Sequence, residues 1–320
     1  MDIYILNNDG FVILESLSNV KIWIVSGVLL ALIIGPMGDI PPTLITVVLM
    51  IQMIFSMEGL SFKINDLKEE KKMISTSVIA CFGISTVVTL IIGSLFISSY
   101  PDVWKGWVIL AAVPSAVSVV TMSLYLNGNV KMTVLSSAAI YLLALIVTPL
   151  ITIPLIGESV DSFKILQYVV LFVAVPMIFT IPMKKLNIRK EAKYIVINLM
   201  MFLLITLSLG QNRDYVFEDP GLVFLIILGC VFRTFGVGFI MMFFMKRFNI
   251  DRRNGMAYIS MAVWKNSGLA ITLCMVLFLD SSIAVIPCVI SLLVELLWFT
   301  VMVGYTDRIW PVKKNNHING

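Results

Sequence analysis

The chain has 320 residues, of which 59% are hydrophobic and only 13% are charged. Soluble domains carry about 25% charged residues, so this composition excludes an ordinary globular protein. It indicates a polytopic membrane protein rather than one with a single anchor. The formal net charge of +4 is no evidence for nucleic-acid binding, because the basic residues are concentrated in particular loops.

Ten apolar runs are long enough to be transmembrane helices. They cover approximately residues 20–38, 41–60, 73–98, 105–126, 130–156, 162–183, 192–210, 220–246, 254–279 and 283–305. Residues 1–19 form a mixed N-terminal segment whose apolar run at 11–14 is too short to span, and residues 306–320 form a tail. No basic region followed by a small-residue cleavage site is present, so we expect no signal peptide.

Basic residues are concentrated in alternate loops, which orients the chain in the membrane. One side carries Lys63, Lys68, Lys71, Lys72, Lys184, Lys185, Arg189, Lys190, Lys193, Lys246, Arg247, Arg252, Arg253, Arg308, Lys313 and Lys314. The loops on the opposite side hold only Lys105, Lys164 and Arg213. We therefore expect a multi-pass cell-membrane protein with both termini cytoplasmic and a solvated belt of basic side chains on the inner face.

With ten spans, the two halves of five have opposite orientations, which is the plan of transporters built from inverted repeats. The predicted fold is an all-α membrane protein with a first repeat over 20–156 and a second over 162–305. In such a fold the fourth and ninth spans, which correspond to each other, are expected to be broken and to cross.

Both of these spans contain residues that interrupt a helix. Pro114, Ser115 and Ser118 lie in the fourth span, and the run 265–268, Lys-Asn-Ser-Gly, lies in the ninth. Proline removes a helical donor, and the Asn-Ser-Gly stretch weakens the helix. Irregular backbone at membrane depth survives only where protein or a cavity covers it. These two segments, with Lys265, Asn266 and Ser267, are therefore the candidate binding site.

Three ionisable residues lie deep in the spans: Arg233, Lys265 and Glu295. At about 1.5 Å per helical residue, all three fall near the middle of a hydrocarbon layer about 30 Å thick. Glu295 can hardly stay ionised and alone at this depth. In one interpretation Glu295 bridges Arg233 and leaves Lys265 free to meet an anionic substrate. In the second interpretation, Glu295 pairs with Lys265 in an ion- or proton-sensitive switch.

The remaining polar residues in the spans have a simpler interpretation. Gln52, Ser56, Asn198 and Thr206 are expected to form interhelical hydrogen bonds rather than to bind ligands. Cys81, Cys230, Cys274 and Cys288 lie in apolar runs without C-x-x-C spacing, and the single histidine, His317, is in the tail. We expect no metal site, no cofactor and no disulfide framework. No catalytic motif such as H-E-x-x-H is present, so we expect no enzyme.

Several short motifs follow one another along the chain, at 57–60, 82–84, 114–129, 148–149 and 266–270. In this order they resemble the bile acid:sodium symporter family, one of a group of ten-span carriers that includes arsenite and auxin efflux carriers. The resemblance implies a panel of spans one, two, six and seven, and a core of the remaining six. The substrate cavity would lie between them, and movement of core against panel would give alternating access.

The family's sodium-ligand positions are changed in this chain. Where the family has serine, asparagine, glutamate and glutamine, the aligned residues are Val119, Val120, Met261 and Lys265, and Cys81 aligns with a further glutamine. Of the polar ligands only Thr133, Ser137 and Asn266 remain. Sodium needs about six hard oxygen ligands by analogy with other hard cations, and an ammonium at a ligand position repels it. Sodium coupling is therefore not expected.

The predicted function is a secondary transporter of a small organic anion that works by alternating access. Lys265 would be a built-in cation that holds the crossing together and attracts a carboxylate, with the helix N-termini at the breaks adding positive potential. Proton coupling through Lys265 is an open question. The sequence is also compatible with an auxin-type or arsenite-type efflux carrier, a channel or a non-transporting sensor. It leaves the substrate, the direction of transport and the oligomeric state open.

Overall fold

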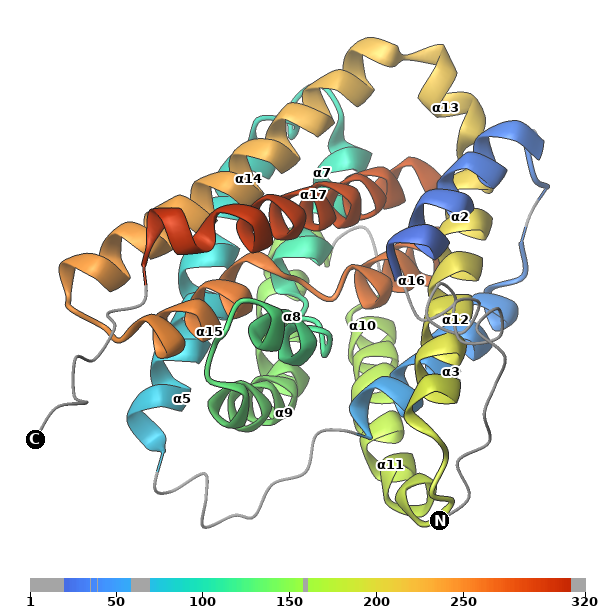
Figure 1. Cartoon of the computed structure of the whole chain (residues 1–320). Helices are drawn as coiled ribbons and strands as arrows, with labels where there is room; N and C mark the ends of the chain where they lie inside the picture. The colour runs from blue at the N-terminus through green and yellow to red at the C-terminus, as the bar shows by residue number, and fades with distance from the viewer. Residues whose placement is uncertain (1–19, 35, 39, 59–69, 158–160, 312–320) are drawn as a thin grey trace, which may run out of the picture.

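A computed structural model describes residues 20–34, 36–38, 40–58, 70–157 and 161–311 (Figure 1). Within these residues the regular elements are helices. Several features predicted from the sequence fall outside them: the apolar run 11–14, Gly59 and Leu60 of the 57–60 motif, and the tail residue His317. The basic residues Lys63, Lys68, Lys313 and Lys314 also lie outside the described residues.

The described residues of the first half of the chain form the following helices. They are α2 (Val20–Ile34), α3 (Pro42–Met57), a continuous stretch of α5 (Lys71–Val78), the π-helix η1 (Ile79–Ser85) and α6 (Thr86–Ser94), the pair α7 (Pro101–Ala112) and α8 (Val119–Tyr125), and α9 (Val130–Ile156). The ends differ from the predicted runs by several residues. The run predicted at 105–126 is divided into two helices.

The second half contains a similar series with one addition. It comprises α10 (Ser162–Val169), η2 (Val170–Ala174) and α11 (Val175–Lys185) in one stretch, α12 (Lys190–Gln211), α13 (Arg213–Glu218), α14 (Pro220–Arg247), α15 (Arg252–Val263), α16 (Ser267–Leu277), the 3₁₀ turn η3 (Ser282–Val285) and α17 (Ile286–Ile309). The short helix α13 was not predicted from the sequence, and the run predicted at 254–279 is divided between α15 and α16.

Within the part of the chain that the structure describes, six helical stretches are long and apolar enough to cross a membrane: Lys71–Ser94, Val130–Ile156, Ser162–Lys185, Lys190–Gln211, Pro220–Arg247 and Ile283–Ile309. The apolar helices α2, α3 and α16 are shorter. This arrangement is that of an all-helical, multi-pass membrane protein. The expectation of a fully solvated basic belt is wrong for Arg252, whose side chain is only 7% exposed and pairs with Asp307 at 2.5 Å.

Local sequence explains where many of these helices start and stop. Asn129, Asp219 and Asp251 each accept hydrogen bonds from backbone amides in the first turn of the helix that follows, which satisfies donors that lack a helical partner. Asn127 and Asn249 follow helix ends with positive φ angles of 55° and 51°. Asparagine tolerates this left-handed conformation better than most residues.

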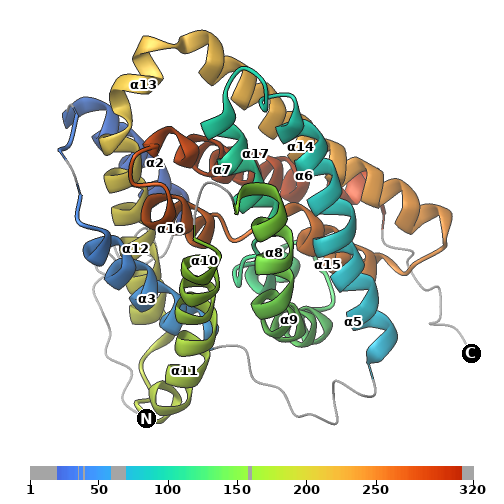
Figure 2. The ribbon, with the colours of Figure 1, turned by 180° about the vertical axis from the view of Figure 1, so that it is seen from behind.

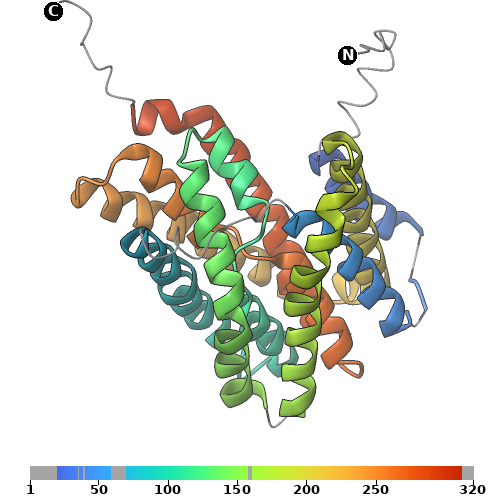
Figure 3. The same ribbon diagram turned by 90° about the horizontal axis from the view of Figure 1, so that it is seen from below.

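The helices associate in two groups (Figure 3). The smaller helix group consists of α2, α3, α10–α11 and α12, in which α12 packs on both α2 and α3 and α11 packs on α3. The larger helix group consists of α5–α9 and α14–α17, and the reverse view shows its helices α5, α7, α9 and α14 together (Figure 2). The groups meet where α16 packs against α3 and α12, and where α10 packs against α9.

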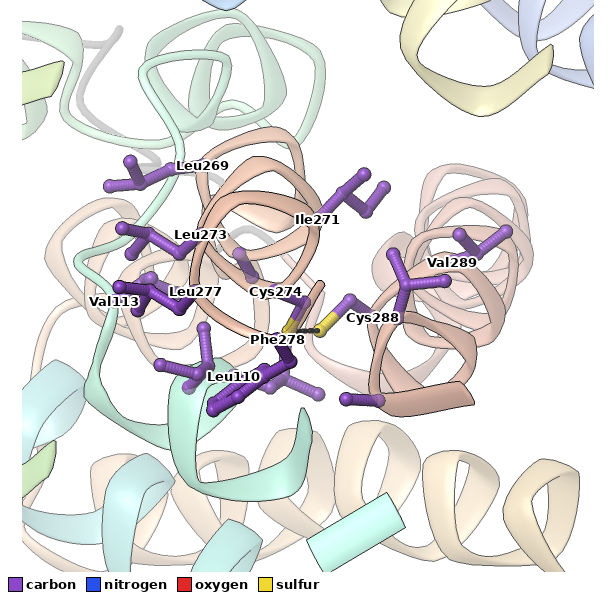
Figure 4. Close-up of a cluster of buried hydrophobic side chains, with 14 of the residues drawn as sticks. Leu110, Val113, Leu269, Ile271, Leu273, Cys274, Leu277, Phe278, Cys288 and Val289 are labelled. Atoms are coloured by element: carbon purple, nitrogen blue, oxygen red, sulfur yellow. Dashed lines mark hydrogen bonds between the residues drawn. The ribbon is translucent and has the colours of Figure 1, made fainter. Parts of the chain in front are cut away.

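A buried apolar cluster fixes α16 against its neighbours in the larger helix group. Leu269, Leu273 and Leu277 form one side of α16 and lie toward Leu110 and Val113 (Figure 4). On another side, the thiols of Cys274 and Cys288 lie 3.8 Å apart and connect α16 to α17. All four cysteines are free thiols. This cluster holds the helix that begins at one of the interrupted segments.

The contact between Gly106 of α7 and the segment before α17 is so close that adding a single methyl group should lower the stability of the protein. A Cβ added at Gly106 in α7 would lie 2.0 Å from the carbonyl oxygen of Ala284, a backbone atom that cannot turn away. Overpacking typically costs about 1–3 kcal/mol, so Gly106→Ala should lower the thermal unfolding temperature of the purified protein in detergent.

The matched control is Gly236→Ala in α14, where an added Cβ would meet nothing within 4 Å. Alanine is intrinsically better than glycine in a helix by about 1 kcal/mol, so this variant should be as stable as the wild type or slightly more stable. Equal unfolding temperatures for the two variants would contradict the predicted contact between α7 and the segment before α17.

Candidate functional site

The two interrupted segments meet each other inside the larger helix group. The helix α7 ends at Ala112 and α8 begins at Val119, while α15 ends at Val263 and α16 begins at Ser267. Ser115 and Lys265 form an isolated antiparallel β-bridge. The amide of Ala116 donates to the Trp264 carbonyl at 3.0 Å, and the amide of Asn266 donates to the Pro114 carbonyl at 2.8 Å. We call this paired region the crossing; the extended link from α15 to α16 is visible in Figure 1.

The residues at the crossing explain why the helices are interrupted there. Pro114 has no amide hydrogen, so α7 cannot continue through it with normal hydrogen bonding. On the opposite segment, the Asn266 side chain accepts the amide of Leu269 at 3.1 Å and caps the start of α16. An asparagine in this position favours a new helix start over continuation of the old helix.

The Lys265 ammonium is fully buried and surrounded by oxygen atoms. It donates to the carbonyls of Ala111 at 2.9 Å, Val113 at 3.0 Å and Cys81 at 3.1 Å, and lies 3.4 Å from the Thr86 hydroxyl. We call these four oxygen atoms the ammonium cradle. The expectation that Lys265 is free to meet a substrate is therefore wrong for this conformation, because protein oxygen atoms occupy its donors.

The cradle combines backbone from two separate helices. Ala111 and Val113 lie at the C-terminal end of α7, where carbonyls lack helical partners and a positive charge is favourable. Cys81 lies in the π-helix η1, a local widening that often occurs at functional sites. The centroid of the Phe82 ring lies 5.4 Å from the ammonium nitrogen, a distance at which a cation is attracted to the face of an aromatic ring.

Arg233 and Glu295 form the buried ion pair at the crossing. Their Nη1 and Oε1 atoms lie 2.6 Å apart, and the two side chains are 1% and 0% exposed. Arg233 also donates to the Ser291 hydroxyl at 2.5 Å and to the Val263 carbonyl at 2.8 Å. Because Val263 is the last residue of α15, the guanidinium neutralises the C-terminal end of that helix.

Glu295 therefore pairs with Arg233, which is the first of the two interpretations offered by the sequence. Its contact with Lys265 is made through the backbone amide of Lys265 at 3.4 Å and not through the ammonium. The second carboxylate oxygen accepts the Ser267 hydroxyl at 3.5 Å. The carboxylate thus lies beside the start of α16, where a negative charge is favourable.

The remaining predicted hydroxyl residues have two kinds of partner: two contact the sulfur of Met261, and the third contacts the segment between α8 and α9. Ser115 and Ser137 donate to the sulfur of Met261 at 3.3 Å and 3.9 Å, so a thioether lies at the position that the resemblance in sequence aligns with a glutamate. Thr133 instead contacts the Ser123 hydroxyl at 3.0 Å and donates to the Asn129 carbonyl at 2.8 Å. Its hydroxyl therefore joins α9 to α8 and the segment between them.

The valines of the predicted set have no polar side-chain atom to offer, and the last serine is exposed. Val119 is fully buried and Val120 is half-buried in α8, and Ser118 is exposed. Among the described residues, no group of three or more His, Cys, Asp or Glu side chains could hold a metal ion.

Residues from several neighbouring helices complete the crossing, and they were not predicted from the sequence. Thr86 and Thr148 donate to the Ala111 and Ala112 carbonyls at 2.8 Å and 2.9 Å. The Tyr141 hydroxyl accepts the Asn266 amide group at 2.8 Å. Hydroxyl groups in otherwise apolar spans were the available signal, but such groups usually bond within their own helix.

A surface hollow elsewhere has a different character. It has a volume of about 420 Å³ between α9 and α10 and is lined by seven apolar residues, among them Leu145, Pro149, Pro154 and Leu166. It contains none of the predicted site residues, so the crossing remains the candidate site.

Comparison with protein families gives a match to the family described as the SBF-like CPA transporter family, over residues 20–308. The matched range begins with the first residue of α2, ends inside the last turns of α17 and includes every residue of the crossing. A search of curated proteins found no significant match.

The buried ion pair predicts a strongly non-additive effect of mutations. Arg233→Met should lower stability by about 3–5 kcal/mol, because it leaves Glu295 charged, buried and without its partner. The double variant Arg233→Met, Glu295→Met should be more stable than the single variant. Thermal unfolding of the wild type, both single variants and the double variant measures this coupling; purely additive effects would contradict the pairing.

Proposed function

The chain belongs to the SBF-like CPA transporter family, and we propose that it moves a small organic anion across the membrane by alternating access. In this proposal the smaller helix group is the panel and the larger helix group is the core. The chain would consist of two inverted repeats, over 20–156 and 162–305, in a cell membrane with both termini cytoplasmic.

The observation that carries the proposal is the ammonium cradle. Three carbonyls and one hydroxyl converge on the Lys265 nitrogen at 2.9–3.4 Å, and carbonyl oxygens are typical ligands of hard cations. A covalently attached ammonium therefore occupies the place of a free monovalent cation. Because it is part of the chain, transport would not require sodium.

The charges at the crossing support an anionic substrate. Lys265 and Arg233 carry two positive charges and Glu295 one negative charge, so their formal sum is +1. Since Lys265 is bonded to the core, its contribution would be a favourable electrostatic potential rather than a direct contact. A potential acts over a Debye length of about 8–10 Å in salt and further in a low-dielectric site.

Asn266 is the residue that would meet the substrate directly. Its amide group faces Met53 of α3, a panel residue, at 3.4 Å, and it also bonds to Tyr141 of the core. It therefore lies where panel and core meet. A substrate bound there would be released to one side or the other as the core moves against the panel.

A cation-binding test separates a built-in cation from an ordinary buried lysine. In Lys265→Ala, the three cradle carbonyls lose the ammonium as a donor; Thr86 still donates to the Ala111 carbonyl, and each carbonyl left without a donor costs about 1–3 kcal/mol. We expect a lower thermal unfolding temperature that millimolar methylammonium or sodium partly restores, because a ligand of the native state stabilises it by mass action. The wild type should show no difference between sodium and potassium at equal ionic strength.

The matched control is Lys265→Met, which fills the space of the lysine stem without its charge. Its thermal unfolding temperature should also be lower than that of the wild type. Methylammonium or sodium should not raise it, because the sulfur and methyl groups of methionine block the cradle. A sodium-specific stabilisation of the wild type, or an equal cation response in both variants, would contradict the proposal.

The transport function itself is tested in proteoliposomes by counterflow of labelled pyruvate, succinate, benzoate and taurocholate. We expect saturable exchange of at least one of these acids, unchanged when choline replaces sodium, and lost in Lys265→Ala. Full wild-type exchange by both Lys265→Ala and Lys265→Gln would overturn the role given to Lys265.

A further inference from the structure

We infer that Gln52 of α3 forms the second half of a carboxylate-binding site, opposite Asn266, the residue that caps the start of α16. This inference rests on the proposed function and extends it, because it assigns a substrate contact to the smaller helix group. From the sequence, Gln52 was expected only to form an interhelical hydrogen bond. Its bond to Met201 of α12 is indeed interhelical, but the acceptor is a thioether sulfur, which leaves room for a stronger partner.

Gln52 reaches from one helix group to the other. It lies on α3 and is 5% exposed. A Cβ added at Gly268 would lie 3.0 Å from its Oε1 atom, so the missing side chain of Gly268 gives Gln52 access to the first turn of α16. The Oε1 atom of Gln52 therefore faces the start of α16, while its Nε2 atom donates to Met201 of α12, so the side chain lies at the boundary between the groups.

Both amide groups donate to the sulfur atoms of methionines, and the Asn266 amide group also donates to the Tyr141 hydroxyl at 2.8 Å. Gln52 Nε2 lies 3.7 Å from Met201 Sδ, and Asn266 Nδ2 lies 3.4 Å from Met53 Sδ. A thioether is a weak acceptor. Buried polar groups that serve only to join helices usually have an oxygen partner, as Thr206 has in the Gly27 carbonyl at 3.3 Å.

A carboxylate would be a better partner for both donors. Hydrogen bonds to an ionised acceptor are roughly twice as strong as neutral ones. Met53 and Met201 have flexible side chains that can turn aside at low cost and then contact the apolar part of a ligand. The thioethers therefore occupy, in this closed conformation, the positions that carboxylate oxygens take when an organic acid is bound.

The inference predicts that Gln52 becomes accessible when the helix groups separate. Gln52→Cys should react with the anionic reagent 2-sulfonatoethyl methanethiosulfonate, whose methanesulfinate group is displaced by the thiolate to give a mixed disulfide. We expect a rate at least about tenfold above that of Thr206→Cys, since local opening exposes only the boundary between groups. Mass spectrometry of the purified full-length protein measures both rates.

Thr206 is a matched control because it is also 5% exposed, yet it bonds to α2 within the smaller helix group. The wild type supplies the background, since all four native cysteines are buried. Met201→Cys is the second test variant and should also react faster than the control. Equal rates at the three introduced thiols, or no reaction at Gln52→Cys and Met201→Cys, would overturn the inference.

Reagent charge tests the class of ligand. At Gln52→Cys, we compare the reaction rate of the anionic reagent with that of its trimethylammonium analogue. The ratio of these two rates should be higher than the same ratio for a free thiol in solution, because the three buried charges sum to +1. Preference for the cationic reagent would overturn the carboxylate assignment. If counterflow of an organic acid is observed but Gln52→Cys does not react, the proposed transport function stands and only the role of Gln52 is overturned.

Discussion

The structure depends on one constraint: backbone groups at the crossing must find partners within the protein. Interrupting two helices at membrane depth frees carbonyls and amides that would each cost several kcal/mol if left unpaired in a lipid environment. At the end of α7, four consecutive carbonyls, from Ala111 to Pro114, each have a donor. The interruption is tolerated because neighbouring helices and the opposite segment supply these donors.

The three deep charges are part of this solution. Lys265 lies at the C-terminal end of α7, Arg233 at the C-terminal end of α15, and Glu295 beside the N-terminal end of α16. Each charge therefore faces the end of a helix dipole that favours it. Arg233 and Glu295 also neutralise each other, whereas the fully buried Lys265 ammonium is compensated by carbonyl dipoles.

The sequence predicted the interruptions and the deep charges because both break an otherwise apolar pattern. Pro114 and the Lys-Asn-Ser-Gly run are visible as local exceptions, and depth follows from position in a span. The partners of Lys265 could not be predicted, because its acceptors are main-chain carbonyls of Cys81, Ala111 and Val113. Main-chain oxygens leave no residue-type signal, and neither does the π-helix that contains Cys81. The thioether partner of Gln52 could not be predicted for a related reason: a polar side chain in a span does not reveal whether its acceptor is an oxygen or a sulfur.

A covalently bound cation has a consequence for energetics. A free ion that binds with the substrate is released with it and contributes its gradient to transport. The Lys265 ammonium remains on the chain in every conformation, so it contributes charge and cohesion but no ion gradient. Under the proposed function, the driving force would come from the gradient of the anion itself, including exchange for a second anion, or from the movement of protons. In that proposal the side chain would keep the crossing assembled when no ion is bound, and it would separate the structural role of the cation from its role in coupling.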